Sequence, residues 1–313
     1  MSRYIVRTVL TAFPTLIGVL TCVFLLTRLI PGDPAILILG GNAPQEQILQ
    51  LRKDLGLDQP IYIQYLHYLY QVFHGDLGVS LRTERSVIKE IMDVLPYTVE
   101  LAVAGIFIST VIGVPIGVIS AQRRNTITDY AAMTFASLGV SMPVFWTGIL
   151  FTLFFSLYLG WFPAIGGGDS ASLTNRIFHL VLPATAIGMA ASAITARMTR
   201  TSMLEILHQD YIRTARAKGL EELKVLYKHA LHNALIPVIT VVGLNMGRLL
   251  GGTIVTEIVF ARPGMGKLLV DAIYARDYPE VQGIVAFFAV MIIIVNLLVD
   301  LAYSVADPRV ELS

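Results

Sequence analysis

RMTRTSMLEILHQDYIRTARAKGLEELKVLYKHALHNA, residues 197–234, is a charged stretch that lies between long apolar runs in the second half of this chain. It carries seven Lys or Arg residues against four Asp or Glu residues. The apolar runs on either side are long enough to cross a bilayer, so the charged stretch must lie in water beside the membrane. We therefore expect residues 197–234 to be a segment that another protein can bind.

The charged stretch has the pattern of two short amphipathic helices. The first apolar face comprises Leu204, Leu207, Tyr211 and Ala215, and the second comprises Leu223, Leu226, Tyr227, Ala230 and Leu231. Gly219 lies between them, where a left-handed residue can end the first helix and turn the chain into the second. These faces either enter a groove on a partner or fold back onto the chain's own spans, and amphipathicity alone leaves both open.

The run RTARAKG, residues 213–219, resembles the EAA loop of ABC importer permeases, a Glu-Ala-Ala triplet followed by a Gly. Ala215 and Gly219 match that motif, whereas Arg213 and Thr214 replace the Glu and the first Ala. Where the general motif then has Ile-x-Leu-Pro, this chain has HALH at residues 229–232. These departures resemble the form of the loop in the dipeptide, oligopeptide and nickel permease subfamily.

Five further strings resemble the same subfamily, and their order and spacing agree with it from end to end. They are IPGDP at residues 30–34, LGLDQP at 55–60, GDLGVS at 75–80, PGMGKLLVDAIYARDYPEVQG at 263–283 and NLLVDLAYSVADPRV at 296–310. One such string would be weak support, but five in register over the whole chain are specific. The chain is similar to the first permease subunit of dipeptide transporters.

The composition is that of an integral membrane protein. Of 313 residues, 55% are apolar and only 14% are charged, with a mean hydropathy of +0.68. A net charge of +1 and the lack of a basic patch with interleaved aromatic residues argue against nucleic acid as a partner. The single cysteine, Cys22, lies in an apolar run and excludes a disulfide framework.

Six apolar stretches are close to or above the length of about 20 residues that a membrane span needs. They are residues 9–30, 99–121, 131–159, 178–196, 235–259 and 283–305. The first is longer than the apolar core of a cleavable signal peptide, so we expect a retained span. The N-terminal tail, the C-terminal tail and the connections on their side of the membrane contain twelve basic residues. The short connections on the other side contain only four. This bias predicts cytoplasmic N- and C-termini.

The predicted organisation has four parts: an N-terminal tail with the first span (1–30), an extracytoplasmic helical insert (31–98), a five-span core containing the cytoplasmic loop 197–234 (99–305), and a cytoplasmic tail (306–313). We expect helices after Pro44 and Pro60 and a third capped by Ser86, with Gly56 ending the first. Their expected apolar faces are Ile48, Leu51 and Leu55; Ile61, Tyr65, Leu69 and Val72; and Ile88, Ile91 and Leu95. The insert either docks a partner or forms a self-packed cap.

Polar and small residues inside the spans indicate the transport pathway. Arg248, near the middle of the fifth span, is costly in lipid unless it faces protein or water, so it either lines the pathway with Asn245 and Ser141 or pairs with a carboxylate. The candidate carboxylates are Asp300 and Glu257. Glycines on the fifth span form a stripe that lets another helix approach closely. The stripe comprises Gly243, Gly247 and Gly251.

No catalytic constellation is evident in the sequence. The run PGMGK at residues 263–267 departs from the phosphate-binding loop at Ala261 and Leu268, and the six histidines lack metal-ligand spacing. We therefore expect a non-catalytic chain that has no cofactor of its own, with ATP and Mg²⁺ bound by partner ATPases as the resemblance implies.

The resemblance implies an all-α permease subunit of an ABC importer for di- or oligopeptides, with six spans in the bacterial inner membrane. Its implied partners are membrane lipid, a homologous second permease subunit, two cytoplasmic ATPases, an extracytoplasmic binding protein and a small peptide substrate. The implied coupling to the ATPases is through residues 199–234, with the contacts made by Arg213, Thr214, Ala215, Arg216, Ala217, Lys218, Gly219, Leu220 and Leu223.

Other functions stay open at this point. The same subfamily also serves glutathione and nickel complexes. A secondary carrier without an ATPase would require broken helices, with which Pro143 and Pro183 in the third and fourth spans are compatible. A scaffold or receptor would bind a partner without moving a solute.

Overall fold

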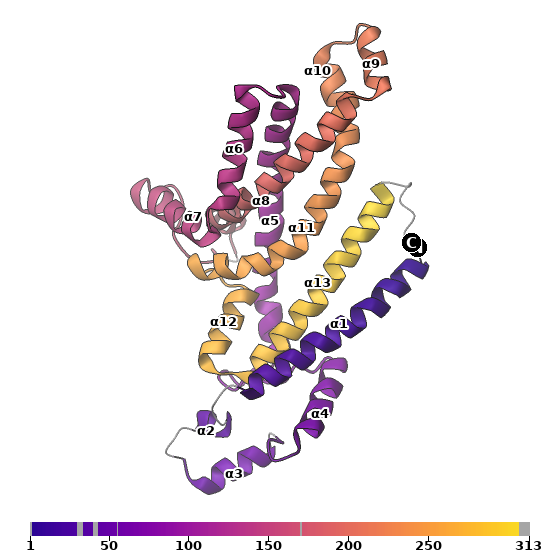
Figure 1. Cartoon of the computed structure of the whole chain (residues 1–313). Helices are drawn as coiled ribbons and strands as arrows, with labels where there is room; N and C mark the ends of the chain where they lie inside the picture. The colour runs from indigo at the N-terminus through magenta and orange to yellow at the C-terminus, as the bar shows by residue number, and fades with distance from the viewer. Residues whose placement is uncertain (1, 30–33, 40–42, 55, 170, 307–313) are drawn as a thin grey trace. The chain divides into compact units, whose positions relative to one another are not determined.

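The computed structural model describes residues 2–29, 34–39, 43–54, 56–169 and 171–306, and within these ranges it is helical with no β-strand (Figure 1). In chain order the helices are α1 (Ser2–Leu29), α2 (Pro34–Leu39), α3 (Gln45–Asp54), α4 (Ile61–Phe73), α5 (Val87–Gln122), α6 (Ile127–Ser141), α7 (Val144–Phe151), the π-helix η1 (Thr152–Tyr158), α8 (Leu173–Leu207), α9 (Asp210–Ala217), α10 (Glu222–Lys224), the π-helix η2 (Val225–Leu231), α11 (His232–Val259), α12 (Met265–Ala275) and α13 (Tyr278–Ala306). The predicted all-α class is confirmed.

Five helical segments among the described residues are long and apolar enough to cross a bilayer. They are Leu10–Leu29, Val87–Gln122, Leu173–Leu207, Glu222–Val259 and Tyr278–Val299. The segments Ile127–Ser141 and Val144–Tyr158 make a sixth span if they are counted as one, with a bend of 98° between them. The predicted number of six is therefore reached only with a bent third span.

The bend divides the predicted third span, residues 131–159, at Pro143, where the sequence is compatible with a helix break. Met142 has φ −87° and ψ 126°, and Pro143 precedes the first residue of α7. A proline ring clashes with a preceding residue in helical conformation, so Met142 is forced into extended conformation and the helix stops. Pro183, by contrast, lies inside an uninterrupted α8, so the break that was considered possible there is absent.

Helix α5 joins two elements that the sequence predicts as separate. The third helix of the insert and the second span form one helix of 36 residues, so the predicted boundary at residues 98 and 99 lies inside it. Pro96 lies in this helix and does not end it. A proline inside a helix removes one backbone hydrogen bond, a loss that a long, packed helix tolerates.

The chain forms two compact units that differ from the predicted parts. Unit 1 comprises Met1–Pro96 and Gly264–Ile294, and unit 2 comprises Tyr97–Pro263 and Val295–Ser313. The segment after Pro263 therefore groups with the insert rather than with the core. Leu55, residues 30–33 of IPGDP and the predicted tail from residue 307 lie outside the described residues.

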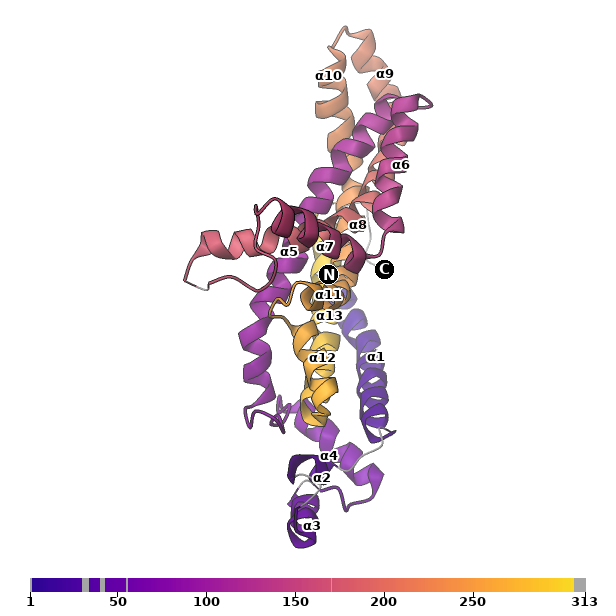
Figure 2. The same ribbon diagram turned by 90° about the vertical axis from the view of Figure 1, so that its left-hand side faces the viewer.

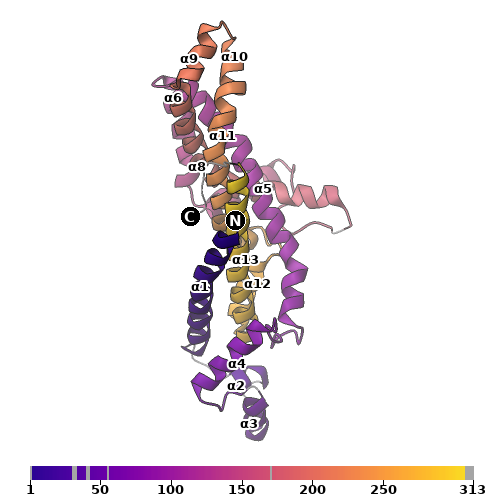
Figure 3. The same cartoon turned by 90° about the vertical axis from the view of Figure 1, so that its right-hand side faces the viewer.

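Unit 1 is held together by two apolar clusters. In the first, α4 packs against α1 and α13 (Figure 3) through Leu20, Phe24, Tyr68 and Ala286. In the second, α12 packs beside α13 and the start of α5 (Figure 2) through Val87, Ile91, Met265, Ala272, Ile284 and Phe288. The predicted apolar face of α4 is partly buried at Tyr65, Leu69 and Val72, whereas Ile61 is exposed. The insert is thus packed against helices of its own unit.

Two strings of the family resemblance meet inside unit 1. The buried Asp277 accepts a hydrogen bond of 2.7 Å from Ser80 Oγ and one of 3.1 Å from the Arg82 backbone N–H. Its other oxygen accepts from the Glu280 backbone N–H at 3.1 Å and so caps the start of α13. One carboxylate therefore ties the GDLGVS loop to the first turn of a span.

In unit 2, glycines allow α5 and α8 to approach closely. A Cβ atom at Gly113 would lie 2.7 Å from the Ser192 carbonyl oxygen, and one at Gly117 would lie 2.6 Å from that of Ala196. Side chains at these positions would force the helices apart. The sequence analysis considered only the glycines of α11 and missed this second glycine face.

Candidate coupling site

The charged stretch forms a helical hairpin in unit 2, in which α8 leads into α9, and α10 with η2 leads into α11 (Figure 1). This corrects the prediction of two separate amphipathic helices. The first apolar face is divided, because α8 ends at Leu207 and Gln209 is extended before α9 begins. The second face is continuous with the fifth span through the π-helical turn η2.

Gly219 makes the turn that the sequence predicts. It has φ +76°, in the left-handed region that favours glycine. The backbone N–H of Gly219 donates to the Arg216 carbonyl at 2.9 Å, and that of Leu220 donates to the Ala215 carbonyl at 3.3 Å. These two bonds are those of a Schellman motif, which satisfies the last carbonyl groups of α9. The turn is thus a defined structure and not a loose connection.

An ion pair braces the turn from the outside. Arg216 Nη2 and Nε donate to the two carboxylate oxygens of Glu222 at 2.7 and 3.1 Å, so α9 and α10 are joined by a bidentate contact. Hydrogen bonding to Glu222 raises the pKa of Arg216 above its ordinary value. Both side chains are about half exposed, so the pair fixes geometry more than it adds stability.

One face of the hairpin is buried against the chain itself. Ile212 and Ala215 of α9 pack with Val225, Leu226 and Ala230 of η2. The same cluster includes Met203 from α8, Ala234 from α11, and Val118 and Ala121 from the end of α5. The hairpin therefore rests on a platform made by the ends of α5 and α8.

The other face of the hairpin is exposed and partly apolar. Leu220, Leu223 and Tyr227 have exposed fractions of 39%, 57% and 55%. The predicted coupling residues Arg213 and Lys218 are exposed near them, as are Thr214, Arg216, Ala217 and Gly219, whereas Ala215 is buried. Packing against the chain itself is therefore confirmed for the buried residues of the apolar faces, and binding to a partner stays a prediction for the exposed ones.

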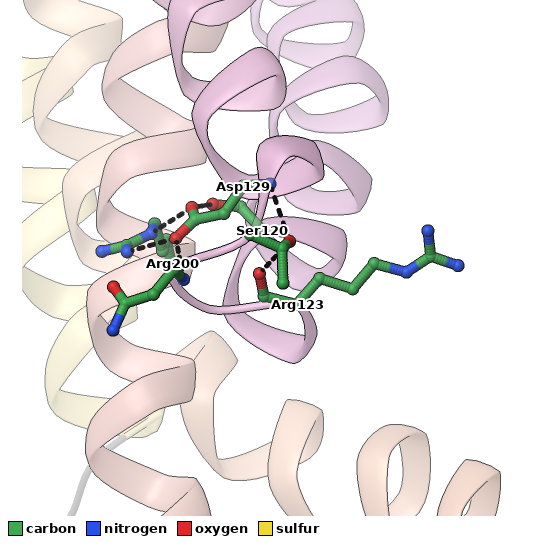
Figure 4. A network of polar contacts seen from close by, with 6 residues as sticks. Ser120, Arg123, Asp129 and Arg200 are labelled. Carbon is green, nitrogen blue, oxygen red and sulfur yellow. Dashed lines mark hydrogen bonds and ion pairs between the residues drawn. The ribbon is translucent and has the colours of Figure 1, made fainter.

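The platform is fastened by a buried ionic network that sequence analysis missed (Figure 4). Asp129, 2% exposed at its side chain, lies at the start of α6 and accepts from Arg200 of α8 at 2.8 and 2.7 Å. It also accepts from Ser120 of α5 and from the Asn125 backbone N–H at 2.9 Å. Figure 4 shows the Arg123 guanidinium pointing away from this carboxylate. One carboxylate therefore links α5, α6 and α8.

A local signal for Asp129 was present in the sequence. Thr126 followed three residues later by an acid, before an apolar run, is the pattern of a capping box. In the structure Thr126 Oγ1 accepts from the Asp129 backbone N–H at 3.5 Å. The pattern would have marked Asp129 as a helix-start residue, but not Arg200 as its partner, because 71 residues separate them.

The predicted pathway residues do not form one cluster in the described structure. Arg248 is exposed on α11 and has no ion pair among the described side chains, while Glu257 is buried and accepts from Thr98 at 2.7 Å. The side chain of Asp300 lies outside the described residues. Asn245 is buried with its Nδ2 unpaired in the described part of the chain, and Ser141 donates to the Ser137 carbonyl on its own helix.

The glycine stripe of α11 meets a neighbouring helix at two of its three positions. A Cβ atom at Gly243 would lie 2.6 Å from Val299, and one at Gly247 would lie 2.9 Å from Asn296 Oδ1, both on α13. At Gly251 no described atom lies within 4 Å of such a Cβ. Close approach therefore involves Gly243 and Gly247 only.

The described helices define a multi-pass membrane protein in which a braced hairpin joins two of the span-length helical segments. Residues 113–312 match the family described as "Binding-protein-dependent transport system inner membrane component", and residues 1–102 match the N-terminal family of the same membrane components. The chain belongs to this family of binding-protein-dependent transport system inner membrane components, and it is a multi-pass protein of the inner membrane.

Relatives of known name cover the whole chain. It is 41% identical to the dipeptide transport system permease protein DppB of Escherichia coli K12 over 99% of both chains. It is 43% identical to DppB of Alkalihalophilus pseudofirmus over 99% of this chain and 100% of that one. It is 41% identical to the di/tripeptide transport system permease protein DppB of Pseudomonas aeruginosa over 99% of both.

Solved structures share the fold at low sequence identity. A chain of the inward-facing MetNI methionine ABC transporter matches with a TM-score of 0.59 and 17% identity, over 70% of this chain and 96% of that one. A chain of an amino acid ABC transporter crystallised with histidines matches with a TM-score of 0.53 and 15% identity, over 69% and 94%. These matches support the permease architecture alone.

Proposed function

We propose that the chain is the permease subunit of an ATP-driven ABC importer for di- or oligopeptides. The observation that carries this proposal is the hairpin, which packs against the chain's own helices and leaves an apolar and basic face uncovered. The relatives named for dipeptide transport agree with this function over the full length of the chain. The chain itself is non-catalytic, and ATP and Mg²⁺ are bound by partner subunits.

The proposed partners follow from the same family membership. A homologous second permease subunit completes the pathway, two cytoplasmic ATPases seat against Leu220 and Leu223, and an extracytoplasmic binding protein delivers the peptide. We propose that the hairpin and both chain termini are cytoplasmic, which the basic residues of the hairpin support. ATP drives transport because it favours one of two states through contacts that differ between them.

The function is tested by reconstitution. The complete complex, in liposomes with ATP inside and the binding protein outside, is expected to import a radiolabelled dipeptide, and non-hydrolysable ATP is expected to stop the import. Liposomes that hold this chain alone under a proton gradient serve as the second arm. Gradient-driven uptake by the chain alone would favour a secondary carrier and contradict the proposal.

Arg248 provides a test of the pathway. An exposed guanidinium without an ionic partner among the described side chains is costly in a span unless water or a partner faces it. We propose that it receives the substrate carboxylate. We expect Arg248→Met to reduce uptake of a dipeptide by about tenfold or more, the loss that one charge-assisted contact predicts.

The matched measurement uses a peptide whose C-terminus is amidated. Its uptake is expected to depend little on Arg248, because it carries no carboxylate for the guanidinium to hold. Equal losses for the free and the amidated peptide would mean that Arg248 acts on the structure of the spans and not on the substrate.

A further inference from the structure

Helix α4 of the insert has an exposed apolar face that the described part of the chain does not cover. The helix contains no Asp, Glu, Lys or Arg residue. Tyr62, Leu66 and Tyr70 have exposed fractions of 66%, 62% and 62%. Ile63 and Phe73 are also exposed, and all five lie on one side of the helix at about 100° per residue. An apolar face of this kind is costly in water, so it indicates contact with apolar surroundings.

The same helix lies against a membrane span over part of the length of that span (Figure 3). The hydroxyl groups of Tyr65 and Thr21 are hydrogen-bonded at 2.6 Å, and the ring of Tyr65 packs on that of Phe24 with centroids 5.3 Å apart. Thr21 and Phe24 belong to Leu10–Leu29, the part of α1 that is long and apolar enough to cross a bilayer. Helix α4 is therefore beside this span and not beyond its end.

The C-terminal end of α4 reaches further along the span than its start. Gln64, in the first turn of α4, accepts from Arg28 at 3.1 and 2.9 Å, near the end of the span. Phe73, the last residue of α4, stacks on Phe13 with ring centroids 5.9 Å apart. Arg28 and Phe13 are about 22 Å apart along α1, at 1.5 Å of rise per residue. Helix α4 thus runs from one end of the span into its apolar part.

The exposed face of α4 is continuous with the exposed side of α1. Phe13 and Phe73 are each about half exposed although their rings stack on one another. Leu25 and Leu26 of the same span are also exposed. The apolar side chains that a span exposes are suited to lipid, because acyl chains are as apolar as leucine. The surroundings that suit Phe13 therefore extend over Phe73.

Polar residues directly after α4 indicate that the helix lies along the membrane boundary and does not cross the bilayer. His74 and Asp76 are exposed, and Gly75 between them has φ +79°, so the chain turns at once after Phe73. Tyrosine rings favour the level of the lipid headgroups, where the ring is in apolar surroundings and the hydroxyl is hydrated. A helix with an apolar face rich in tyrosine is suited to the boundary between headgroups and acyl chains, about 5–10 Å into the bilayer.

We propose that α4 is an interfacial helix, inserted in one leaflet of the bilayer beside α1, and that phospholipid covers its exposed face. The face comprises Tyr62, Ile63, Leu66, Tyr70 and Phe73. The insert, which the sequence predicts outside the membrane, is then partly embedded in it. The inference goes beyond the proposed function, because it holds for either orientation of the chain and for any solute.

The test is site-specific photocrosslinking in the complete complex, reconstituted with its binding protein in nanodiscs that contain radiolabelled phosphatidylethanolamine. Leu66 or Tyr70 is replaced by p-benzoylphenylalanine, which on irradiation bonds to neighbouring C–H groups. Both positions are exposed, so the replacement disturbs little packing. We expect each variant to acquire labelled lipid on this chain, because acyl chains lie against both side chains.

Two further positions calibrate the label. Leu26 is exposed within the span Leu10–Leu29, so the same residue placed there should acquire lipid. Tyr227 is similarly exposed but lies on the hairpin, in the charged stretch, and should give only background label. The label at Leu66 and Tyr70 is expected to match that at Leu26 and not that at Tyr227.

Failure of either α4 position to acquire lipid, while Leu26 acquires it, overturns the proposal. A crosslink from Leu66 or Tyr70 to the second permease subunit or to the binding protein overturns it in favour of a protein interface. ATP-driven uptake is measured on the same complex in liposomes. Normal uptake without lipid on α4 removes only this proposal, whereas absent uptake with lipid on α4 removes only the importer function.

Discussion

We expect Gly219→Val to abolish peptide uptake while the complex continues to hydrolyse ATP and the chain remains in the membrane. Gly219 has φ +76°, and a Cβ atom there would have no atom of the described residues within 4 Å. There is therefore space for a valine side chain, but the positive φ angle of the backbone is unfavourable for it. A side chain costs about 1–2 kcal/mol in the left-handed region, and a β-branched one costs more.

The strain is relieved only if the turn opens. Opening breaks the hydrogen bonds from Gly219 and Leu220 to the end of α9, and it redirects Leu220 and Leu223, the exposed residues proposed to contact the ATPase. A strain energy of this size corresponds to a reduction of about tenfold or more in the fraction of complexes whose hairpin contacts the ATPase correctly. The measurement is peptide imported per ATP hydrolysed in proteoliposomes.

Two variants separate the turn from general damage. Gly219→Asn should retain most coupling, because asparagine tolerates the left-handed conformation. Gly160→Val introduces comparable strain at φ +66°, also with no described atom within 4 Å of its Cβ, but it lies far along the chain from the hairpin. Wild-type coupling in Gly219→Val, or equal uncoupling in Gly160→Val, would contradict the role of the hairpin turn in coupling ATP hydrolysis to transport.

The turn at Gly219 could be predicted from the sequence because its causes are local. A glycine between two apolar periodicities needs only its own conformational freedom and the preceding helix to make a Schellman turn. The same holds for Gly56, which has φ +63° at the predicted end of the first insert helix. Predictions of this kind depend on a few neighbouring residues, all of which the sequence displays.

The division of the hairpin into a buried and an exposed face could not be predicted. Whether Leu226 or Tyr227 is covered depends on Val118 and Met203, which approach from helices that are distant in sequence. Periodicity shows that an apolar face exists but not which surface it meets. For the same reason the sequence did not indicate that Asp277 would bind the loop at Ser80, 197 residues away.

The same local rule has different outcomes at two prolines of this chain. Proline marks boundaries by its effect on the preceding residue, and at Pro143 it ends a helix, whereas at Pro96 the helix continues. The sequence shows the same residue type in both cases. At Pro96 the helix is well packed, because Ile91 and Leu101, on either side of it, are both completely buried.

The second large effect is expected from Asp129→Ala, which should lower the thermal stability of the purified complex. The change leaves Arg200, Ser120 and the Asn125 N–H without their shared acceptor. Breaking a buried ion pair costs about 3–5 kcal/mol, and we expect about 2–4 kcal/mol here because solvent screens the partly exposed Arg200. Thermal unfolding of the purified complex measures the loss.

A double variant isolates the pair itself. Asp129→Ala/Arg200→Met removes both charges and should recover part of the lost stability, because an apolar pair avoids an uncompensated buried charge. Asp93→Ala is the control, because its ion pair with Arg85 is similar in length, 2.8 Å, but both side chains are more than half exposed and the pair should contribute little to stability. Equal effects of Asp129→Ala and Asp93→Ala would contradict the assigned role.

The network should also affect coupling, because it fastens the platform on which the hairpin rests. Ser120 lies between Val118 and Ala121, and Arg200 lies one helical turn before Met203, so the ionic network and the apolar cluster share the same ends of α5 and α8. If the hairpin couples the ATPases to the spans, loss of the network lets the hairpin move independently of α5 and α8. The amount of peptide imported per ATP should then fall even in complexes that remain folded. If stability falls but the amount of peptide imported per ATP stays at the wild-type value, the network only supports the fold and the platform has no role in coupling.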